Sequence, residues 1–168
     1  MASLKELIAA SDVLVENFRP GVMERLGFGY RRAVEINPSV IMCSISAFGQ
    51  RSPYAKRPAG DMVVQAMGGI ASLTGEPNGP PQTTGMSISD TTGGIHAFGA
   101  ICAALYRRSI TGLGQYIDLS LTDCILWQNE WASQQLFLSG GKAVPSRYGN
   151  RRPILIPGNF FRGKDGWV

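Results

Sequence analysis

Short apolar runs alternate with segments of helical periodicity along this chain, and that alternation constrains the fold more than any other sequence feature. The clearest run is 40–46, Val-Ile-Met-Cys-Ser-Ile-Ser, and shorter runs of the same kind occupy 13–17 and 116–121. Helical patterns lie between them, most clearly at 30–36 and 87–107. Because strands that alternate with helices favour a parallel sheet, we predict an α/β fold with short parallel strands.

Further helical segments complete the pattern without a linker that would divide the chain. We expect them near 4–11, 22–26, 61–73 and 122–138. The Gly68-Gly69 pair inside the third segment predicts close packing or a kink, because glycine weakens an isolated helix. We therefore treat residues 1–168 as a single unit.

The last residues suggest that this unit is a partial domain. Residues 165–168, Asp-Gly-Trp-Val, are typical of a turn followed by the first residues of a strand. Since a strand needs several residues to pair, we expect the domain to continue beyond this sequence.

A polar loop follows the clearest strand and is a first candidate for ligand binding. Residues 48–54, Phe-Gly-Gln-Arg-Ser-Pro-Tyr, contain both glycine and proline. Open α/β sheets bind ligands at the carboxyl ends of their strands. We expect a site at this edge.

Charge and composition narrow the classes of ligand. The net charge of +4 comes from 16 basic and 12 acidic residues that are scattered along the chain. Nucleic-acid binders concentrate basic residues on one face, so we expect no nucleic acid. The surplus suits an anionic small ligand, although charge alone favours an ordinary solvated surface.

Three isolated cysteines and the absence of a leader pattern bear on the compartment. Cys43, Cys102 and Cys124 each lie in an apolar run, which predicts buried reduced thiols. The first residues lack the apolar stretch of a signal peptide, and the most apolar segment, 95–106, is too short to span a membrane. We expect a soluble cytoplasmic protein.

Several familiar kinds of catalytic site lack their residues here. His96 is the only histidine and lies among apolar residues at helical spacing, which favours a packing role over a triad. No His, Cys, Asp and Glu cluster has metal-ligand spacing, so no metal site is predicted. The phosphate-binding glycine signatures are incomplete at 27–29 and 112–114.

Asp90 is the carboxylate with the most suggestive setting. It stands at the predicted start of a long helix and is followed closely by Gly93 and Gly94. A helix N-terminus favours an anionic group, and a carboxylate can act as a covalent nucleophile toward activated acyl groups. The residues alone favour a structural role, because Ser87 and Asp90 have the spacing of a helix-capping box, which is the commoner use of these residues.

Several segments together resemble the family III coenzyme A transferases, which include formyl-CoA transferase, carnitine CoA-transferases and α-methylacyl-CoA racemase. The order and spacing of these segments carry the resemblance over nearly the whole chain. They are 11–21 (SDVLVENFRPG), 25–30 (RLGFGY), 37–41 (NPSVI), 46–50 (SAFGQ), 65–69 (QAMGG), 74–77 (TGEP), Asp90 with its glycines, and 111–115 (TGLGQ).

The resemblance implies a fold, a reaction and roles for three residues. The chain would be part of a Rossmann-like large domain, and Asp90 would be the nucleophile that attacks an acyl-CoA thioester and forms a mixed anhydride. Coenzyme A would return to give an aspartyl-CoA thioester, into which a carboxylic acid exchanges. Asn17 and Arg25 would contact coenzyme A, which is a substrate, and no tightly bound cofactor is implied.

The resemblance also implies a quaternary structure and leaves other functions open. Family subunits are threaded through one another, so we expect a homodimer for the full-length protein. The racemase branch has a histidine before the aspartate that matches Asp61, whereas Gly60 stands here, which favours transfer over racemisation. Family members extend beyond both ends of this sequence, so a non-catalytic fragment that binds acyl-CoA is the other alternative. The acyl donor and acceptor acid are not identified by the sequence.

Overall fold

The computed structural model describes residues 2–151 and 157–168, and its centre is a parallel three-stranded sheet in the order β1-β2-β3. The strands are β1 (Val13–Glu16), β2 (Ile41–Ser46) and β3 (Gln115–Ser120). Ile41 is opposite Val13 on one side and Gln115 on the other, so β2 is the central strand. This confirms the predicted α/β fold with short parallel strands.

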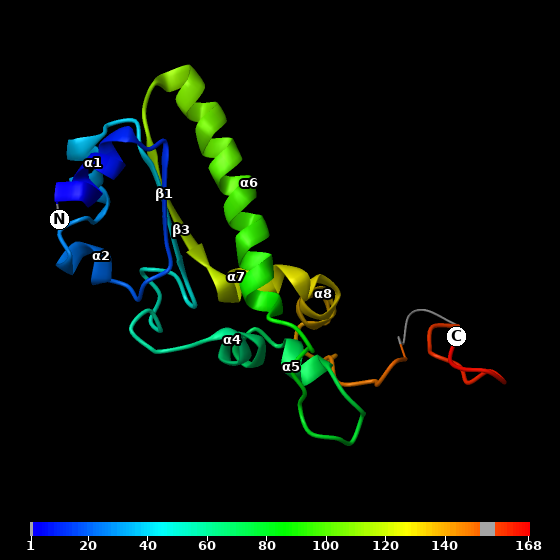
Figure 1. Ribbon diagram of the computed structural model, residues 1–168. Helices are drawn as coiled ribbons and strands as arrows, with labels where there is room; N and C mark the ends of the chain where they lie inside the picture. The colour runs from blue at the N-terminus through cyan, green and yellow to red at the C-terminus, as the bar shows by residue number, and fades with distance from the viewer. Residues whose placement is uncertain (1, 152–156) are drawn as a thin grey trace.

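Helices connect the strands and cover the sheet (Figure 1). Two short helices lie between β1 and β2, and the long α6 precedes β3. The helices are α1 (Ala2–Ala10), α2 (Val22–Arg25), α3 (Tyr30–Ile36), α4 (Asp61–Met67), α5 (Ile70–Leu73), α6 (Ile88–Thr111), α7 (Leu121–Gln128) and α8 (Glu130–Leu138).

The sheet separates two apolar clusters. Met42 points into a cluster with Ile8 of α1 and Phe28 of the loop between α2 and α3, whereas the next residue, Cys43, points into a cluster with Val64 and Ile125. Successive side chains of a strand face opposite sides, so the central strand is buried on both faces. Figure 1 shows α1 and α6 on opposite sides of the sheet.

Contacts at both ends fix the position of α6. Near its carboxyl end, the Arg108 guanidinium pairs with the Asp12 carboxylate at 2.8 Å and donates to the Ser39 carbonyl at 3.2 Å. Near its amino end, a Cβ atom on Gly93 would lie 2.2 Å from Cδ2 of Leu121, so glycine permits the close approach of α6 and α7. The first turn of α6 is therefore held against the carboxyl edge of the sheet.

Each of the predicted helices 61–73 and 122–138 forms two shorter helices in the structure. One hydrogen bond connects the two points of interruption. The segment 61–73 is interrupted at Gly69, whose φ of +92° is left-handed. The segment 122–138 is interrupted at the buried Asn129, which donates from Nδ2 to the Gly68 carbonyl at 2.6 Å. The glycine pair thus produces the expected kink, and Asn129 satisfies a carbonyl that the kink frees.

The predictions for the thiols and for the C-terminal residues can also be compared with the structure. Cys43 and Cys124 are buried as predicted, but Cys102 is exposed because it lies on the face of α6 that no other described element covers. Residues 161–168 form a small hairpin with a bridge between Arg162 and Trp167, which explains the turn predicted there. None of the described helices is long and apolar enough to cross a membrane.

Candidate active site

A cavity of about 220 Å³ lies at the carboxyl edge of the sheet, where a ligand site was expected. Each strand contributes to it: Asn17 follows β1, Ser46 ends β2 and Leu121 follows β3. Asp61 from α4 and Asp90 from α6 complete its acidic lining. The cavity therefore collects residues that are far apart in the sequence.

Asp90 lies in the first turn of α6, as predicted, and is exposed toward this cavity. Partial burial of its carboxyl group and the negative charge of Asp61 both raise its pKa above the ordinary value of 3.8. A carboxylate with a raised pKa is more basic and therefore a better nucleophile once it is ionised, which suits attack on a thioester.

The predicted capping box does not form. Ser87 occupies the N-cap position of α6, but its side chain makes no capping hydrogen bond. The carboxylate of Asp61 takes this role from a different helix, because it accepts hydrogen bonds from the backbone N–H of Ser89 at 2.9 Å and from the Ser89 hydroxyl. The Asp90 side chain is thereby released from capping and remains available in the cavity.

Asp61 is the second carboxylate of the site, and its environment opposes that of Asp90. Burial alone would raise its pKa, but hydrogen bonds from Ser89, from Gln65 and from the backbone of Asp90 lower the pKa below 3.8. Two neighbouring carboxyl groups with opposite pKa shifts commonly divide their roles. Here the pKa of Asp61 is lowered and that of Asp90 is raised, so their surroundings distinguish the two carboxyl groups.

The two predicted coenzyme A contacts have different positions. Asn17 lines the cavity with Asp90, and its Nδ2 donates to the Ile45 carbonyl at 2.8 Å. Arg25 is exposed at the end of α2 and is not among the residues that line this cavity. The structure thus brings Asn17 and Asp90 together and leaves Arg25 outside.

Positive charge and an unpaired hydroxyl also face the site. Arg19 and Arg57 line the cavity, and the Arg57 guanidinium lies 4.6 Å from the centre of the Tyr54 ring. The Ser46 hydroxyl is buried and has no hydrogen-bond partner among the described residues. Cations near two carboxylates suit an anionic ligand, and a buried hydroxyl without a partner is a group that a ligand could satisfy.

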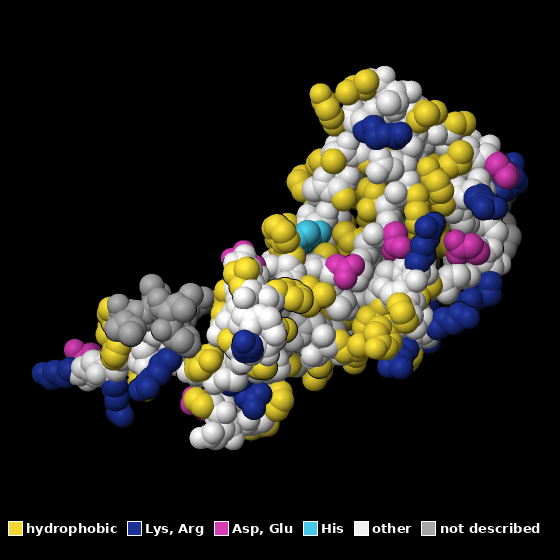
Figure 2. Space-filling view, turned by 180° about the vertical axis from the view of Figure 1, so that it is seen from behind, with side chains coloured by type: hydrophobic (Ala, Val, Ile, Leu, Met, Phe, Trp, Pro, Cys, Tyr) yellow, Lys and Arg dark blue, Asp and Glu magenta, His cyan; other side chains and the backbone are white. Residues whose placement is uncertain are grey.

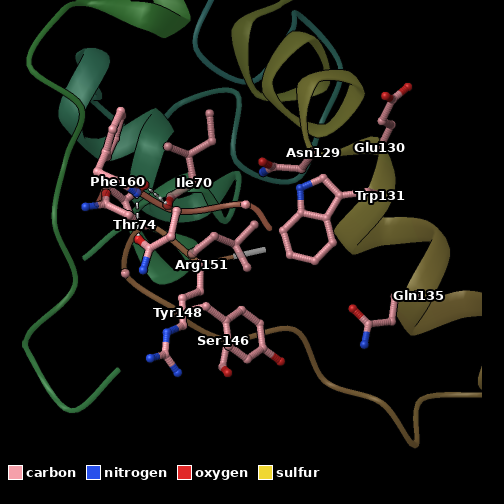
Figure 3. Close-up of a pocket in the computed structure, with 15 residues that line it drawn as sticks. Ile70, Thr74, Asn129, Glu130, Trp131, Gln135, Ser146, Tyr148, Arg151 and Phe160 are labelled. Atoms are coloured by element: carbon pink, nitrogen blue, oxygen red, sulfur yellow. Dashed lines mark hydrogen bonds between the residues drawn. The ribbon is translucent and has the colours of Figure 1, made fainter. Parts of the chain in front are cut away.

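His96 and a second cavity lie outside this arrangement. Nδ1 of His96 is 2.9 Å from the Thr92 carbonyl of its own helix, which agrees with the predicted packing role. A larger cavity of about 750 Å³ is lined by Asn129, Trp131 and Tyr148 among others (Figure 3) and contains none of the predicted site residues. In the parts of the chain that the structure describes, no group of three His, Cys, Asp or Glu residues could hold a metal ion.

Sequence reasoning missed Asp61 and Gln65 as parts of the site. These residues stand four apart on α4, a spacing at which Asp and Gln side chains meet on a helix surface. That spacing was the available signal. Their link to Ser89 depends on tertiary packing, which no local pattern encodes.

Comparison with known proteins identifies the class to which this fold and site belong. The sequence profile of CoA-transferase family III matches residues 1–168. The chain is 47% identical to the acetyl-CoA:oxalate CoA-transferase of Acetobacter aceti over 95% of its own length and 41% of that protein. It is 36% identical to the human succinyl-CoA:glutarate CoA-transferase over 98% of its length and 37% of that protein.

A solved structure agrees with these matches. A CAIB/BAIF family protein from Brucella suis superposes with a TM-score of 0.90 at 38% identity, over 98% of this chain and 43% of the other. The chain belongs to CoA-transferase family III. It spans about two fifths of the length of the relatives it matches.

Proposed function

We propose that the protein transfers coenzyme A from an acyl-CoA to a carboxylic acid, with the Asp90 carboxylate as covalent nucleophile. The observation that carries this proposal is the placement of Asp90 with Asn17 in one cavity at the carboxyl edge of the sheet. Two relatives are named as an acetyl-CoA:oxalate and a succinyl-CoA:glutarate CoA-transferase, and these names support the same class of reaction.

The first half-reaction moves the acyl group to the protein. An Asp90 carboxylate oxygen attacks the thioester carbonyl carbon, the C–S bond breaks, and coenzyme A leaves as a thiolate. The thiolate then attacks the Asp90 carbonyl carbon of the resulting anhydride, and the donor acid leaves as a carboxylate. The product is an aspartyl-CoA thioester, which conserves the energy of the original thioester.

The second half-reaction repeats these steps in reverse with a new acid. The acceptor carboxylate attacks the aspartyl thioester and releases coenzyme A thiolate, which attacks the acceptor carbonyl of the new anhydride. The new acyl-CoA forms and the Asp90 carboxylate is regenerated. The attacking and leaving groups are carboxylates and thiolates throughout, so no proton is transferred in these steps.

The surrounding residues suit the charges of this reaction. Arg19 and Arg57 at the cavity favour an anionic acid substrate, and Asn17 offers an amide to the ligand. Arg25 lies outside the cavity, and we propose that it pairs with a coenzyme A phosphate, because those phosphates are remote from the thiol. Gly60 supplies no proton-transfer group beside Asp90, which favours transfer over racemisation.

The full-length protein is further proposed to be a cytoplasmic homodimer. Apolar side chains are open on the face that Figure 2 shows. The exposed large apolar residues of the chain include Ile95, Phe98 and Ile110 of α6 and Phe137 of α8. Exposed apolar surface of this kind marks contacts with other parts of a protein. Light scattering of the full-length protein tests the proposal, since a monomer would exclude a homodimer.

Turnover of an Asp90→Ala variant tests the proposed function. In the full-length protein we expect this change to abolish transfer between acyl-CoA and an acid while the far-ultraviolet circular dichroism stays unchanged. Asp123→Ala is the matched control, because Asp123 is also exposed in the first turn of a helix but lies outside the cavity. Transfer by Asp90→Ala at the control rate would rule out the mechanism.

A further inference from the structure

Gln65 is almost completely buried, with 1% of its surface exposed, although its side chain ends in a polar amide. Its amide oxygen accepts a hydrogen bond from the Thr84 backbone N–H at 2.9 Å, and the Thr84 hydroxyl lies 3.3 Å away. Its amide nitrogen lies 3.3 Å from the Met86 carbonyl. Gln65 thus holds the segment 84–86 that leads into α6.

The same amide nitrogen connects this segment to the helix start. Nε2 of Gln65 donates to Oδ2 of Asp61 at 2.5 Å, while the other oxygen of Asp61 accepts from the backbone N–H of Ser89 at 2.9 Å. Ser89 directly precedes Asp90. One buried amide therefore fixes both the approach to α6 and the carboxylate that caps it.

We propose that Gln65 is a positioning residue for Asp90: it orients the Asp61 carboxylate and the 84–86 segment so that α6 begins where Asp90 faces the cavity. This inference rests on the proposed function, because it gives Asp90 the role of nucleophile. Gln65 lies outside the residues that line the cavity, so it acts through Asp61 and the segment rather than on the substrate.

The chemistry of the amide explains why glutamine suits this position. The site needs a donor toward Asp61 and the Met86 carbonyl, and an acceptor toward the Thr84 N–H, on one planar group. Leucine has a similar size but neither function. Glutamate keeps the acceptor and supplies a donor only when it is protonated, so it converts the position into a pH-sensitive one.

Two variants of the full-length protein test the proposal. Gln65→Leu should lower kcat by about 10–100-fold with little change in KM for acyl-CoA, because a small misplacement of a nucleophile slows chemistry more than binding. Relative to wild type at the same pH, Gln65→Glu should keep much of its kcat at acidic pH and lose it as pH rises, because the introduced carboxylate, once ionised, would repel Asp61. Wild type should show no such loss, since Asp90 becomes more reactive as it ionises.

A control and a second readout separate positioning from simple core packing. Gln134 is exposed on α8, and both Gln134→Leu and Gln134→Glu should behave as wild type. Amide hydrogen exchange should be faster at Thr84 and Ser89 in Gln65→Leu, because their acceptors are removed or released. Should Gln65→Leu fail to fold, the pH profile of Gln65→Glu at acidic pH still decides the question.

The outcomes distinguish this inference from the function on which it rests. Wild-type kcat in folded Gln65→Leu, or a wild-type pH profile in Gln65→Glu, would overturn the positioning role while leaving Asp90 as nucleophile. A wild-type protein that transfers no coenzyme A would instead overturn the proposed function. In that case unchanged exchange at Thr84 and Ser89 in Gln65→Leu would refute the structural part as well.

Discussion

The Asp61 carboxylate accepts a hydrogen bond from the backbone N–H of Ser89 at 2.9 Å, across 28 residues of sequence. Asp61 thus caps α6 from another helix and takes up backbone donors that would otherwise stabilise an anion at the helix start. Asp90 is left beside a fixed negative charge instead. Partial burial of Asp90, together with the charge of Asp61, raises the pKa of Asp90 even though it stands at a helix N-terminus.

Asp61→Asn should extend activity of the full-length protein to lower pH. Burial and the charge of Asp61 both raise the pKa of Asp90, and the variant removes the second cause only. Because Asp90 must be ionised to attack, the acidic limb of the pH profile of kcat/KM should move toward lower pH. The maximum rate should fall as well, since an asparagine amide cannot accept all the bonds that Asp61 accepts.

Asp123→Asn serves as the control for this shift, because it removes an exposed carboxylate from a different helix start. Its acidic limb should coincide with that of wild type. An unchanged acidic limb of the kcat/KM profile in Asp61→Asn would show that the charge of Asp61 does not affect the pKa of Asp90.

Asp90→Asn should stabilise the fold near neutral pH. The pKa of Asp90 is higher in the folded protein than its ordinary value of 3.8, so wild type loses stability as pH rises through the folded-state pKa. Asparagine does not ionise and avoids this loss. The unfolding temperature of the variant should exceed that of wild type near neutral pH, and the difference should shrink toward about pH 4.

Thermal unfolding of both proteins across this pH range checks the sign. A variant that is less stable than wild type at neutral pH would show that the ionised carboxylate has favourable contacts in the fold. The upward direction of the pKa shift of Asp90 would then be wrong.

Gly93→Ala and Gly94→Ala should have opposite effects on stability although the residues are adjacent in α6. A Cβ at position 93 would lie 2.2 Å from Leu121 Cδ2, so repacking should cost about 1–3 kcal/mol. A Cβ at position 94 meets no atom within 4 Å, and alanine should stabilise the helix there by about 0.5–1 kcal/mol. Urea unfolding of each variant measures the two values, and equal effects would contradict the packing of α6 on α7.

Gly60→Tyr should narrow the range of acyl groups that the protein accepts. Gly60 lines the cavity, a Cβ there meets no atom within 4 Å, and its φ of −124° is open to any residue. Tyrosine should fill part of the roughly 220 Å³ cavity and lower kcat/KM by about tenfold more for bulky than for small acyl-CoA substrates. Gly60→Ala is the matched control and should discriminate as wild type does.

The strands and most helix boundaries were predictable because they depend on local patterns. The helix at 30–36 has the predicted limits, and the run at 40–46 forms a strand that starts one residue later. The divided helices were only partly predictable, since the kink at Gly69 follows from glycine but the break at Asn129 depends on its bond to Gly68.

The candidate site was predictable only where a residue carried its own signal. Asp90 was singled out by its helix start and glycines, but the role predicted for it and the choice of Asn17 came from the family resemblance. The structure places both residues in one cavity. The capping role expected for Ser87 was wrong because Asp61, from α4, supplies the acceptor. Exposure of Cys102 was also not predictable, because its apolar neighbours lie on a helix face that the described elements leave open.

The most direct test is to trap the covalent intermediate on Asp90. The full-length protein is mixed with an acyl-CoA and hydroxylamine, which converts activated carboxyl groups to hydroxamates, and the modified residue is mapped by peptide mass spectrometry. We predict a hydroxamate at Asp90 that requires acyl-CoA and is absent from the Asp90→Ala variant. Transfer of coenzyme A without modification of Asp90, or with the hydroxamate on another carboxylate, would contradict the role proposed for this residue.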